Sequence, residues 1–291
     1  MNPAIPLEPI QGLLLQLTEK ISAIPDHALF AAAPPILPAV ERQKQLDAGQ
    51  YLLVPNGSIL RVETAKGLLD FILGVVHEYL PERRAPIAQL REFMQSRPEI
   101  MQDFFAKALA NDTRYLMDLG RRLDQEPDVI LFLSIYLLRA YRRHLAAALL
   151  DQIDMKNWWR GYCPVCGHWP GLAFLHADSG QRDLWCVACT TTWRFKRIQC
   201  PFCLNENQSQ LHYLSVEDEV MQQLRLYLCD NCRRYLKCVA VNEAASFSAM
   251  EKDVAYLTSA YLDYLATEKG YIQEPVSSVR YSPETVNHYH A

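Results

Sequence analysis

Eight of the nine cysteines in this chain form four Cys-x-x-Cys pairs, and all four pairs lie within one stretch of 70 residues. The pairs are Cys163/Cys166, Cys186/Cys189, Cys200/Cys203 and Cys229/Cys232. A Cys-x-x-Cys turn directs two sulfur atoms at one point, and two such turns supply the four thiolates of a tetrahedral metal centre. Four turns therefore predict two complete four-cysteine sites with no ligand left over.

The spacing of the pairs favours sequential pairing of the turns. The first two pairs are separated by 19 residues, a spacing typical of a four-cysteine site, and the last two by 25 residues, which is slightly longer. Both halves begin with Cys-Pro-x-Cys, which resembles one duplicated unit. We predict that the first pair joins the second and that the third joins the fourth, while a crossed pairing stays open at this point.

Other uses of paired cysteines fit this chain less well. A thioredoxin-like redox site needs a Cys-x-x-Cys at a helix N-terminus beside a βαβ pattern, which the sequence lacks. A disulfide scaffold is typical of small secreted chains rather than of a chain with a large helical part. Four cysteines also suit an iron–sulfur cluster, but two turns per site favour a single tetrahedral ion. Zinc and iron both suit such a site.

Composition and charge limit the surroundings in which the chain works. It has 291 residues, of which 50% are hydrophobic, and a formal net charge of -4. The N-terminal residues 1–17 carry no secretory pattern, and the most apolar run, Val129–Leu138, is too short for a bilayer, which needs about 20 residues. We therefore expect a cytoplasmic protein without membrane insertion, in which thiols stay reduced and bind metal.

Charge also argues against nucleic acid as a partner. Residues 161–241 contain eight Lys and Arg residues and seven Asp and Glu residues, which gives a net charge of +1 before the thiolates are counted. Each four-thiolate site around a divalent ion then adds two negative charges, so this segment is close to neutral or acidic and is a poor partner for phosphate.

The segment before the cysteines has a helical pattern. Apolar residues recur at helical spacing between Leu68 and Leu150, with breaks at Pro81 and Pro98 and an N-cap expected at Asp112. These residues predict the core of a helical bundle. The proline-rich arm over residues 25–57 contains one short helix, Ala39–Leu46, and we expect the arm to lie on the bundle.

From Gly161 onward the pattern changes to short β segments between turns, followed by one amphipathic helix that ends near Gly270. The predicted strands are Leu184–Trp185, Trp193–Ile198, Leu211–Leu214, Leu224–Leu228 and Tyr235–Val241. The ninth cysteine, Cys238, lies on the last strand outside any pair and is predicted to be a small buried residue. His168 and His176 lie near the first site, where exposed loop positions are expected rather than contacts with the ligands.

The order of these motifs resembles the FdhE family of formate dehydrogenase accessory proteins. The resemblance covers residues 158–270 and is weak over the N-terminal half. It is carried by the following segments: Trp159–Gly167, Leu184–Cys189 with Trp193, Cys200 and Cys203, Leu211–Tyr213 with Glu217–Glu219, Cys229–Cys232, Tyr235–Lys237 and Glu268–Tyr271.

From these patterns and the resemblance together we expect an α+β fold and a division of the chain into four parts. The fold is an N-terminal all-α bundle followed by two tandem rubredoxin-like or zinc-ribbon metal modules and a C-terminal helix. The expected parts are a helical domain with the proline-rich arm (1–157), a first rubredoxin-like module (158–198), a second (199–243), and the C-terminal helix and tail (244–291).

The resemblance also implies a function. Relatives bind the catalytic subunit of respiratory formate dehydrogenases during maturation, so we expect a non-enzymatic accessory protein with two mononuclear metal ions, iron being favoured over zinc. His212, Glu217 and Asp218 are the candidate partner-binding residues, because they match the family in the Leu211–Glu219 segment. Two other functions stay open: a rubredoxin-like electron carrier or thiol-redox protein, and a nucleic-acid-binding zinc ribbon.

Overall fold

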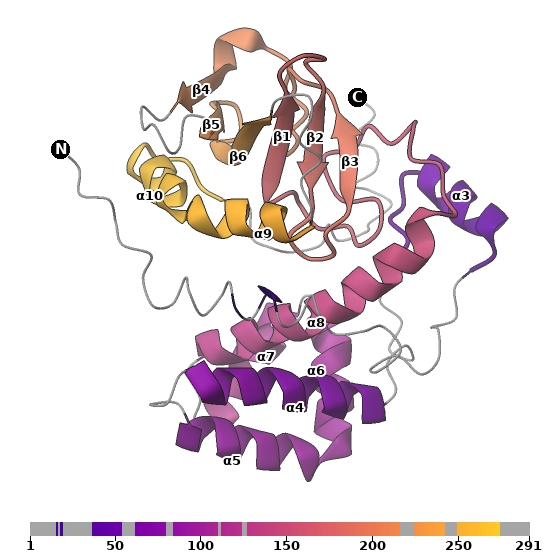
Figure 1. Cartoon of the computed structure of the whole chain (residues 1–291), viewed down its shortest axis with the longest axis vertical. Coiled ribbons are helices and arrows are strands. Elements are labelled where there is room, and N and C mark those ends of the chain that lie inside the picture. Colours follow the sequence, from indigo (N-terminus) through magenta and orange to yellow (C-terminus); the bar gives the residue numbers. More distant parts are fainter. Residues whose placement is uncertain are drawn as a thin grey trace. The chain divides into compact units, whose positions relative to one another are not determined.

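The computed structural model describes residues 16, 18–19, 37–53, 62–79, 84–109, 112–123, 127–215, 224–241 and 249–273. The chain forms two compact units, one made of Met1–Leu37 and Val54–Leu145, the other of Pro38–Leu53 and Ala146–Ala291. The mixture of helices and a sheet confirms the predicted α+β fold with an N-terminal helical part (Figure 1). The four-part division of the chain stays a prediction.

The first unit is built from helices packed around an apolar core. Its described helices are α4 (Val62–Tyr79), α5 (Arg84–Gln95), α6 (Pro98–Leu109), α7 (Thr113–Arg122) and most of α8 (Pro127–Leu150). Leu69, Ile72 and Leu73 recur on one face of α4 and are buried against residues of the other helices, as the helical spacing predicts. This unit is therefore held together by the apolar faces of its helices.

Two residues set the boundaries of these helices. The side chain of Asp112 accepts a hydrogen bond from the backbone N–H of Tyr115 at 3.1 Å, which confirms the predicted N-cap of α7. Pro98, which was predicted only as a break, is the first residue of α6. The N–H of a residue at this position makes no hydrogen bond within the helix, so proline is tolerated there.

The second unit contains one six-stranded sheet in the order β3-β2-β1-β6-β5-β4. The strands are β1 (Leu172–His176), β2 (Arg182–Trp185), β3 (Thr192–Phe195), β4 (Leu211–Ser215), β5 (Leu224–Cys229) and β6 (Arg234–Val241). Neighbouring strands are antiparallel except β1 and β6, which pair in parallel with Leu172 opposite Lys237. This parallel pair joins two antiparallel three-stranded halves, each carrying two of the Cys-x-x-Cys turns, into a single sheet.

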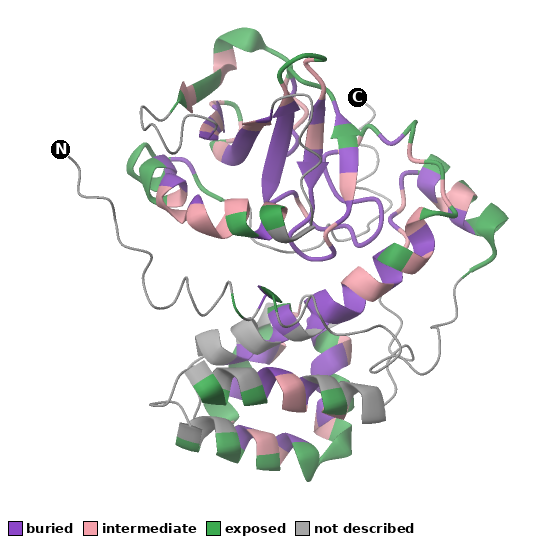
Figure 2. Ribbon diagram, viewed as in Figure 1, coloured by how far each residue is buried: buried purple, intermediate pink, exposed green. Residues whose placement is uncertain are grey.

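Two helices cover one face of this sheet. The predicted single C-terminal helix is in fact α9 (Ala249–Thr258) and α10 (Ala260–Glu268), interrupted at Ser259. They lie along the sheet in Figure 1, and Leu262 and Ala266 of α10 are buried in its core. Figure 2 shows that β1 is largely buried, whereas β4 at the edge is mostly exposed or half-buried.

The segment that contains α3 (Ala39–Asp47) belongs to the second unit. The backbone N–H groups of Leu52 and Leu53 donate to the carbonyls of Pro164 and Val165 at 3.0 and 2.7 Å. The expectation that the proline-rich arm lies on the helical bundle was therefore wrong for residues 38–53, which pack on the first Cys-x-x-Cys turn. Residues 25–36 and 54–57 of the arm lie outside the described residues.

Candidate metal centres

The first cluster brings together Cys163, Cys166, Cys186 and Cys189, and all four are buried. Their Sγ atoms are 3.5 Å apart for Cys163 and Cys189, 3.5 Å for Cys166 and Cys186, and 3.4 Å for Cys166 and Cys189. The first turn precedes β1, and the second connects β2 to β3. This cluster therefore lies at one end of the β2–β3 hairpin.

The second cluster brings together Cys200, Cys203, Cys229 and Cys232. The Sγ atoms of Cys200 and Cys232 are 3.7 Å apart, as are those of Cys203 and Cys229. One turn lies between β3 and β4, and the other connects β5 to β6. Cys203 and Cys232 are only half-buried, so this cluster is closer to solvent than the first. In both clusters the turns are paired in sequential order.

All four turns share one backbone geometry. The residue after the second cysteine has a positive φ: 71° at Gly167, 61° at Thr190, 58° at Leu204 and 56° at Arg233. Its N–H donates to the carbonyl of the first cysteine of its turn at 2.8–2.9 Å. Within the described residues, the last three are the non-glycine residues with positive φ. Because L-residues adopt this conformation at a cost of about 1–2 kcal/mol, the turns are held by the surrounding structure.

The sulfur positions fit a tetrahedral metal ion. With a metal–sulfur bond of about 2.3 Å, the edges of a regular tetrahedron are about 3.8 Å long, close to the separations found here. A disulfide would need about 2.05 Å, and all the cysteines are free. Burial raises the pKa of the Cys163 and Cys166 thiols well above the usual value, so a cation is needed for these sulfurs to be thiolates. Each group can hold a metal ion.

Polar side chains that the sequence did not single out contact the sulfurs. The Thr191 hydroxyl lies 3.1 Å from Cys189 Sγ in the first cluster. In the second, Asn231 Nδ2 donates to Cys203 Sγ at 3.4 Å and Asn205 Nδ2 lies 3.9 Å from Cys229 Sγ. Such contacts stabilise thiolate charge. Each lies two residues after a cysteine, and this position is the signal that would have indicated them.

The two histidines near the first cluster differ from each other. His168 is 1% exposed, and its Nδ1 lies 3.2 Å from the carbonyl oxygen of Cys166, so its expected position in an exposed loop was wrong. The chain turns back at Cys163, whose N–H donates to the His168 carbonyl, and this places the ring inside. His176 is half-buried and contacts Asp183 Oδ2 at 2.8 Å. Cys238 is buried, as predicted, and burial raises its pKa to about 12.

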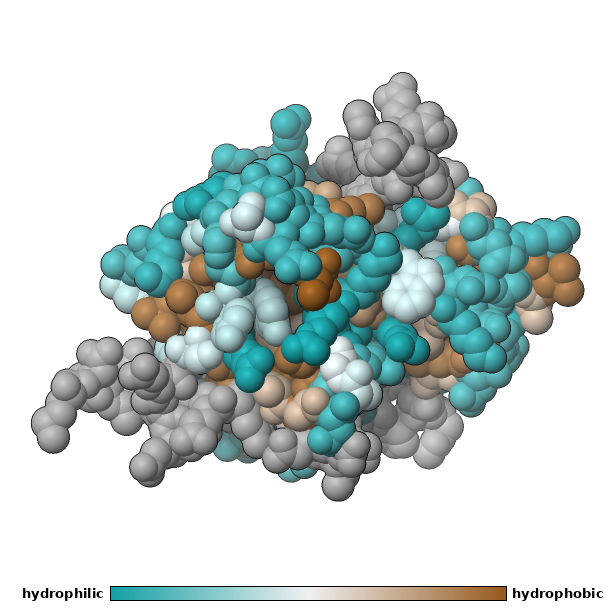
Figure 3. Space-filling model, turned by 90° about the horizontal axis from the view of Figure 1, so that it is seen from above, coloured by the Kyte–Doolittle hydropathy of each residue, from teal (hydrophilic) through white to brown (hydrophobic). Residues whose placement is uncertain are grey.

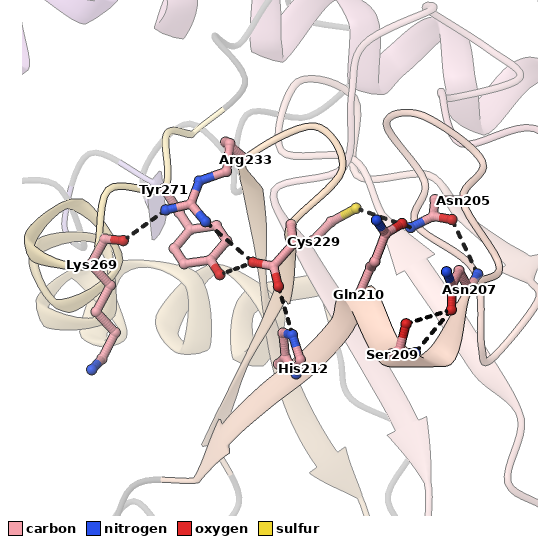
Figure 4. Close-up of polar contacts among 10 residues, drawn as sticks. Asn205, Asn207, Ser209, Gln210, His212, Cys229, Arg233, Lys269 and Tyr271 are labelled. Carbon is pink, nitrogen blue, oxygen red and sulfur yellow. Dashed lines mark hydrogen bonds and ion pairs between the residues drawn. The ribbon is translucent and has the colours of Figure 1, made fainter.

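The candidate partner-binding residue His212 takes part in a network centred on Asp230. His212 Nε2 lies 2.7 Å from Asp230 Oδ2, while the Tyr271 hydroxyl and Arg233 Nη1 donate to Oδ1 (Figure 4). The Arg233 guanidinium also lies 4.1 Å from the centre of the Tyr271 ring and donates to the carbonyl of Lys269. The network thus joins the last Cys-x-x-Cys turn to β4 and to the segment after α10. The other two candidates, Glu217 and Asp218, lie outside the described residues.

The surface seen in Figure 3 is mostly hydrophilic, with smaller hydrophobic areas between the polar side chains. In the part of the chain that the structure describes, no helix has the length and apolar character needed to cross a membrane.

The fold and the clusters define a class of protein in which a helical unit is joined to one sheet that carries two four-cysteine centres. A family model described as FdhE, C-terminal domain, matches residues 198–279. The curated relatives and the solved structure described below carry the same name, so all three comparisons find similarity between this chain and the FdhE family.

The relatives agree on this family. Protein FdhE of Escherichia coli O1:K1 / APEC and Protein FdhE of Shigella boydii serotype 18 are each 25% identical to this chain over 209 residues, or 71% of its length. The chain spans 63% of the length of these relatives. The crystal structure of the FdhE protein from Pseudomonas aeruginosa has the same fold, with a TM-score of 0.58, 24% identity and 95% of both chains covered.

Proposed function

We propose that this chain is a non-enzymatic accessory protein that binds the catalytic subunit of a formate dehydrogenase in the cytoplasm during maturation. Similarity to the FdhE family supports this role. The observation that carries the proposal is the convergence of all eight paired cysteines into two four-sulfur clusters on one sheet. In the described part of the chain, these clusters are the groups of three or more His, Cys, Asp or Glu side chains that converge closely enough to hold a metal.

Each cluster holds one metal ion in this proposal. Cys163, Cys166, Cys186 and Cys189 would hold the first, and Cys200, Cys203, Cys229 and Cys232 the second. Four thiolates suit iron and zinc alike, and the family resemblance favours iron. Such an ion supplies folding free energy, and in the case of iron also a one-electron redox couple. The short strands that precede and follow each turn would depend on these ions for their order.

The partner surface is proposed to lie on the second unit around β4. His212 is exposed on this edge strand, with 47% of its side chain accessible, and its contact with Asp230 places it beside the second cluster. Glu217 and Asp218 follow β4 in the sequence and are proposed to contribute negative charge to partner recognition. A partner that recognises these residues would present basic side chains to them.

A pull-down with the purified catalytic subunit of a formate dehydrogenase tests this function. The full chain should capture the subunit, and the double variant Glu217→Lys, Asp218→Lys should capture less of it while both metals stay bound. The variant Glu99→Lys, on α6 in the first unit, is the matched control and should bind normally. Failure of the unmodified chain to capture the subunit would contradict the proposal.

One observation favours a second candidate function, that of an electron carrier. Cys203 and Cys232 are half-buried, so a redox partner would have access to a metal ion in the second cluster. Asn231 donates to a sulfur of this cluster, and such hydrogen bonds would tune the reduction potential of an iron ion held there. If the second site holds iron, reversible bleaching of its visible absorption by dithionite within the physiological range of potentials would support this role. Zinc in both sites would exclude it.

A further inference from the structure

The sheet of the second unit has two chemically different faces. Along β5, Leu224, Leu226 and Leu228 are buried in the core that α9 and α10 cover. Because successive side chains of a strand point to opposite faces, Arg225 and Tyr227 belong to the other face, and both are half-buried there. Along β5, the face away from the helices therefore carries one charged and one aromatic side chain.

A cavity of about 380 Å³ lies against this second face, beside the second cysteine cluster. Its described lining contains four arginines and neither aspartate nor glutamate; the arginines are Arg182, Arg197, Arg225 and Arg234. Aromatic and aliphatic side chains, including Tyr213, Tyr227 and Phe202, form much of the remainder. A concave site of this size, apolar with a few polar groups, is typical of small-molecule binding sites.

Arg182 is the most unusual of these arginines because it is a buried cation. It is 3% exposed, and its Nη2 donates to the carbonyls of Lys196 and Gln199, while its Nε has no hydrogen-bond partner. Its guanidinium lies 5.2 Å from the centre of the Phe195 ring and 6.0 Å from that of Tyr227. Within the described residues no carboxylate forms an ion pair with it, although a buried charge normally requires one.

The neighbouring cations are likewise available to an anion. The Arg225 guanidinium lies 5.5 Å from the centre of the Tyr213 ring, and Arg197 is exposed at the rim of the cavity. Within the described residues, neither forms an ion pair with an aspartate or glutamate. Tyr213 and Tyr227 are paired across β4 and β5 with their ring centres 6.1 Å apart, so the rings stand beside the guanidinium groups. Positive charge and aromatic surface therefore converge in one place.

From this geometry we infer that the cavity binds a small organic anion, in which a phosphate or carboxylate group is joined to an apolar or aromatic body. Guanidinium groups bind the oxygens of phosphate and carboxylate in a planar, two-pronged geometry. Arg225 and Arg197 are suited to this contact, and Arg182 lines the same cavity. The rings of Tyr213 and Tyr227 would contact the body of the ligand. This binding activity is separate from capture of a formate dehydrogenase and does not depend on it.

A competing explanation is that the arginines balance the charge of the second metal centre. Cys200 and Cys229 line the same cavity, and four thiolates around a divalent ion carry two negative charges. In that case, removing an arginine would lower the metal content of the chain without any anion being bound. The two explanations therefore differ in what they predict for the arginine variants.

The test is a calorimetric titration of the full, metal-loaded chain with inorganic phosphate, adenosine monophosphate, benzoate and adenosine. Adenosine monophosphate or benzoate should bind saturably and more tightly than inorganic phosphate, and uncharged adenosine should not bind. The better of the two shows which of these organic anions the cavity prefers. In Arg225→Gln and Arg197→Gln the affinity should fall about tenfold, the effect of losing one charged hydrogen bond. Arg194→Gln, an exposed arginine of β3 outside the cavity lining, is the matched control and should keep the affinity.

Three results would overturn the inference. They are the failure of both organic anions to bind, binding that both cavity variants leave unchanged, and organic anions that bind no more tightly than inorganic phosphate. A fall in metal content in Arg225→Gln, with no anion binding to the unmodified chain, would assign the arginines to the metal centre instead.

Discussion

Gly161 packs against the backbone of Pro201 so closely that a Cβ atom on Gly161 would lie 1.7 Å from the Pro201 carbonyl oxygen. Gly161 lies two residues before the first cysteine of the first cluster, and Pro201 follows the first cysteine of the second. The loops that carry the two clusters are thus in direct contact. This contact, together with the parallel pairing of β1 and β6, makes the two halves one structural unit.

Replacing Gly161 with alanine should therefore destabilise the second unit. The contacting atom is backbone and cannot rotate away, so one of the loops must shift, at a cost of about 2–4 kcal/mol in the free energy of unfolding. Thermal unfolding of the metal-loaded chain measures this. The control is Gly74→Ala in α4, where a Cβ would contact nothing and alanine favours the helix. Equal melting temperatures for Gly161→Ala and the unmodified chain would contradict the packing.

The two clusters should release their metals at different rates. The four cysteines of the first are buried, whereas Cys203 and Cys232 of the second are half-buried, so a chelator reaches the second more easily. Release to an excess of chelator, followed by absorbance, should show two phases. The fast phase should be missing in the variant Cys200→Ser, Cys203→Ser and retained in Cys163→Ser, Cys166→Ser. A fast phase that disappears with the first pair would show that burial does not govern release.

The residues that follow the first two Cys-x-x-Cys turns should respond differently to substitution: glycine should be tolerated at position 190, and the native glycine should be required at position 167. Thr190 is β-branched with φ 61°, so Thr190→Gly relieves strain and should keep or raise the stability, by up to about 1 kcal/mol. Gly167 also has a positive φ, and a Cβ there would lie 2.6 Å from the Tyr51 ring, so Gly167→Ala should destabilise the chain. Chemical denaturation of both variants measures these opposite shifts. A loss of stability in Thr190→Gly comparable to that in Gly167→Ala would be inconsistent with strain in these turns.

Asp263 should stabilise the packing of α10 on the sheet. Its carboxylate accepts from the Lys237 ammonium at 3.0 Å and from the Tyr235 hydroxyl at 2.9 Å, and Lys237 is 1% exposed. Asp263→Asn leaves the buried ammonium without its counter-charge and should cost about 2–3 kcal/mol at pH 7, less than for a fully buried pair because Asp263 is partly exposed. Glu268→Gln, on the exposed side of α10, is the control and should change little.

The pH dependence of the Asp263→Asn variant provides a second readout. Burial lowers the pKa of Lys237 below the ordinary 10.5, although Asp263 opposes the shift. Below this lowered pKa, Lys237 is charged in the folded state, and burying that charge reduces the free energy of unfolding. Above pH 10.5, Lys237 is uncharged in both the folded and the unfolded state, so this cost is absent. Stability therefore rises with pH across this window, and the variant's deficit should be smaller at pH 10 than at pH 7. A deficit that stays constant between these values would mean that the Lys237 charge is not its cause.

The sequence predicted the cysteine turns and the helical character of the first half, because both depend on local spacing. It missed β1, whose run Leu172–Leu175 is buried throughout and lacks the alternation that marks a strand with one exposed face. It also missed the parallel pairing of β1 with β6, since partners separated by 65 residues leave no local signal. Each of the four turns is followed by a residue with positive φ, and only at Gly167 did the residue type indicate this conformation in advance.

The metal content of paired cysteine variants tests the two-site account most directly. Elemental analysis of chains purified without air should give two ions for the unmodified protein. It should give one ion for Cys163→Ser, Cys166→Ser and one for Cys200→Ser, Cys203→Ser, because each cluster draws its ligands from separate turns. Cys238→Ser, which alters the buried ninth cysteine, should keep both ions. Two ions in either double variant, or a loss in Cys238→Ser, would contradict the assignment of the eight cysteines to two separate sites.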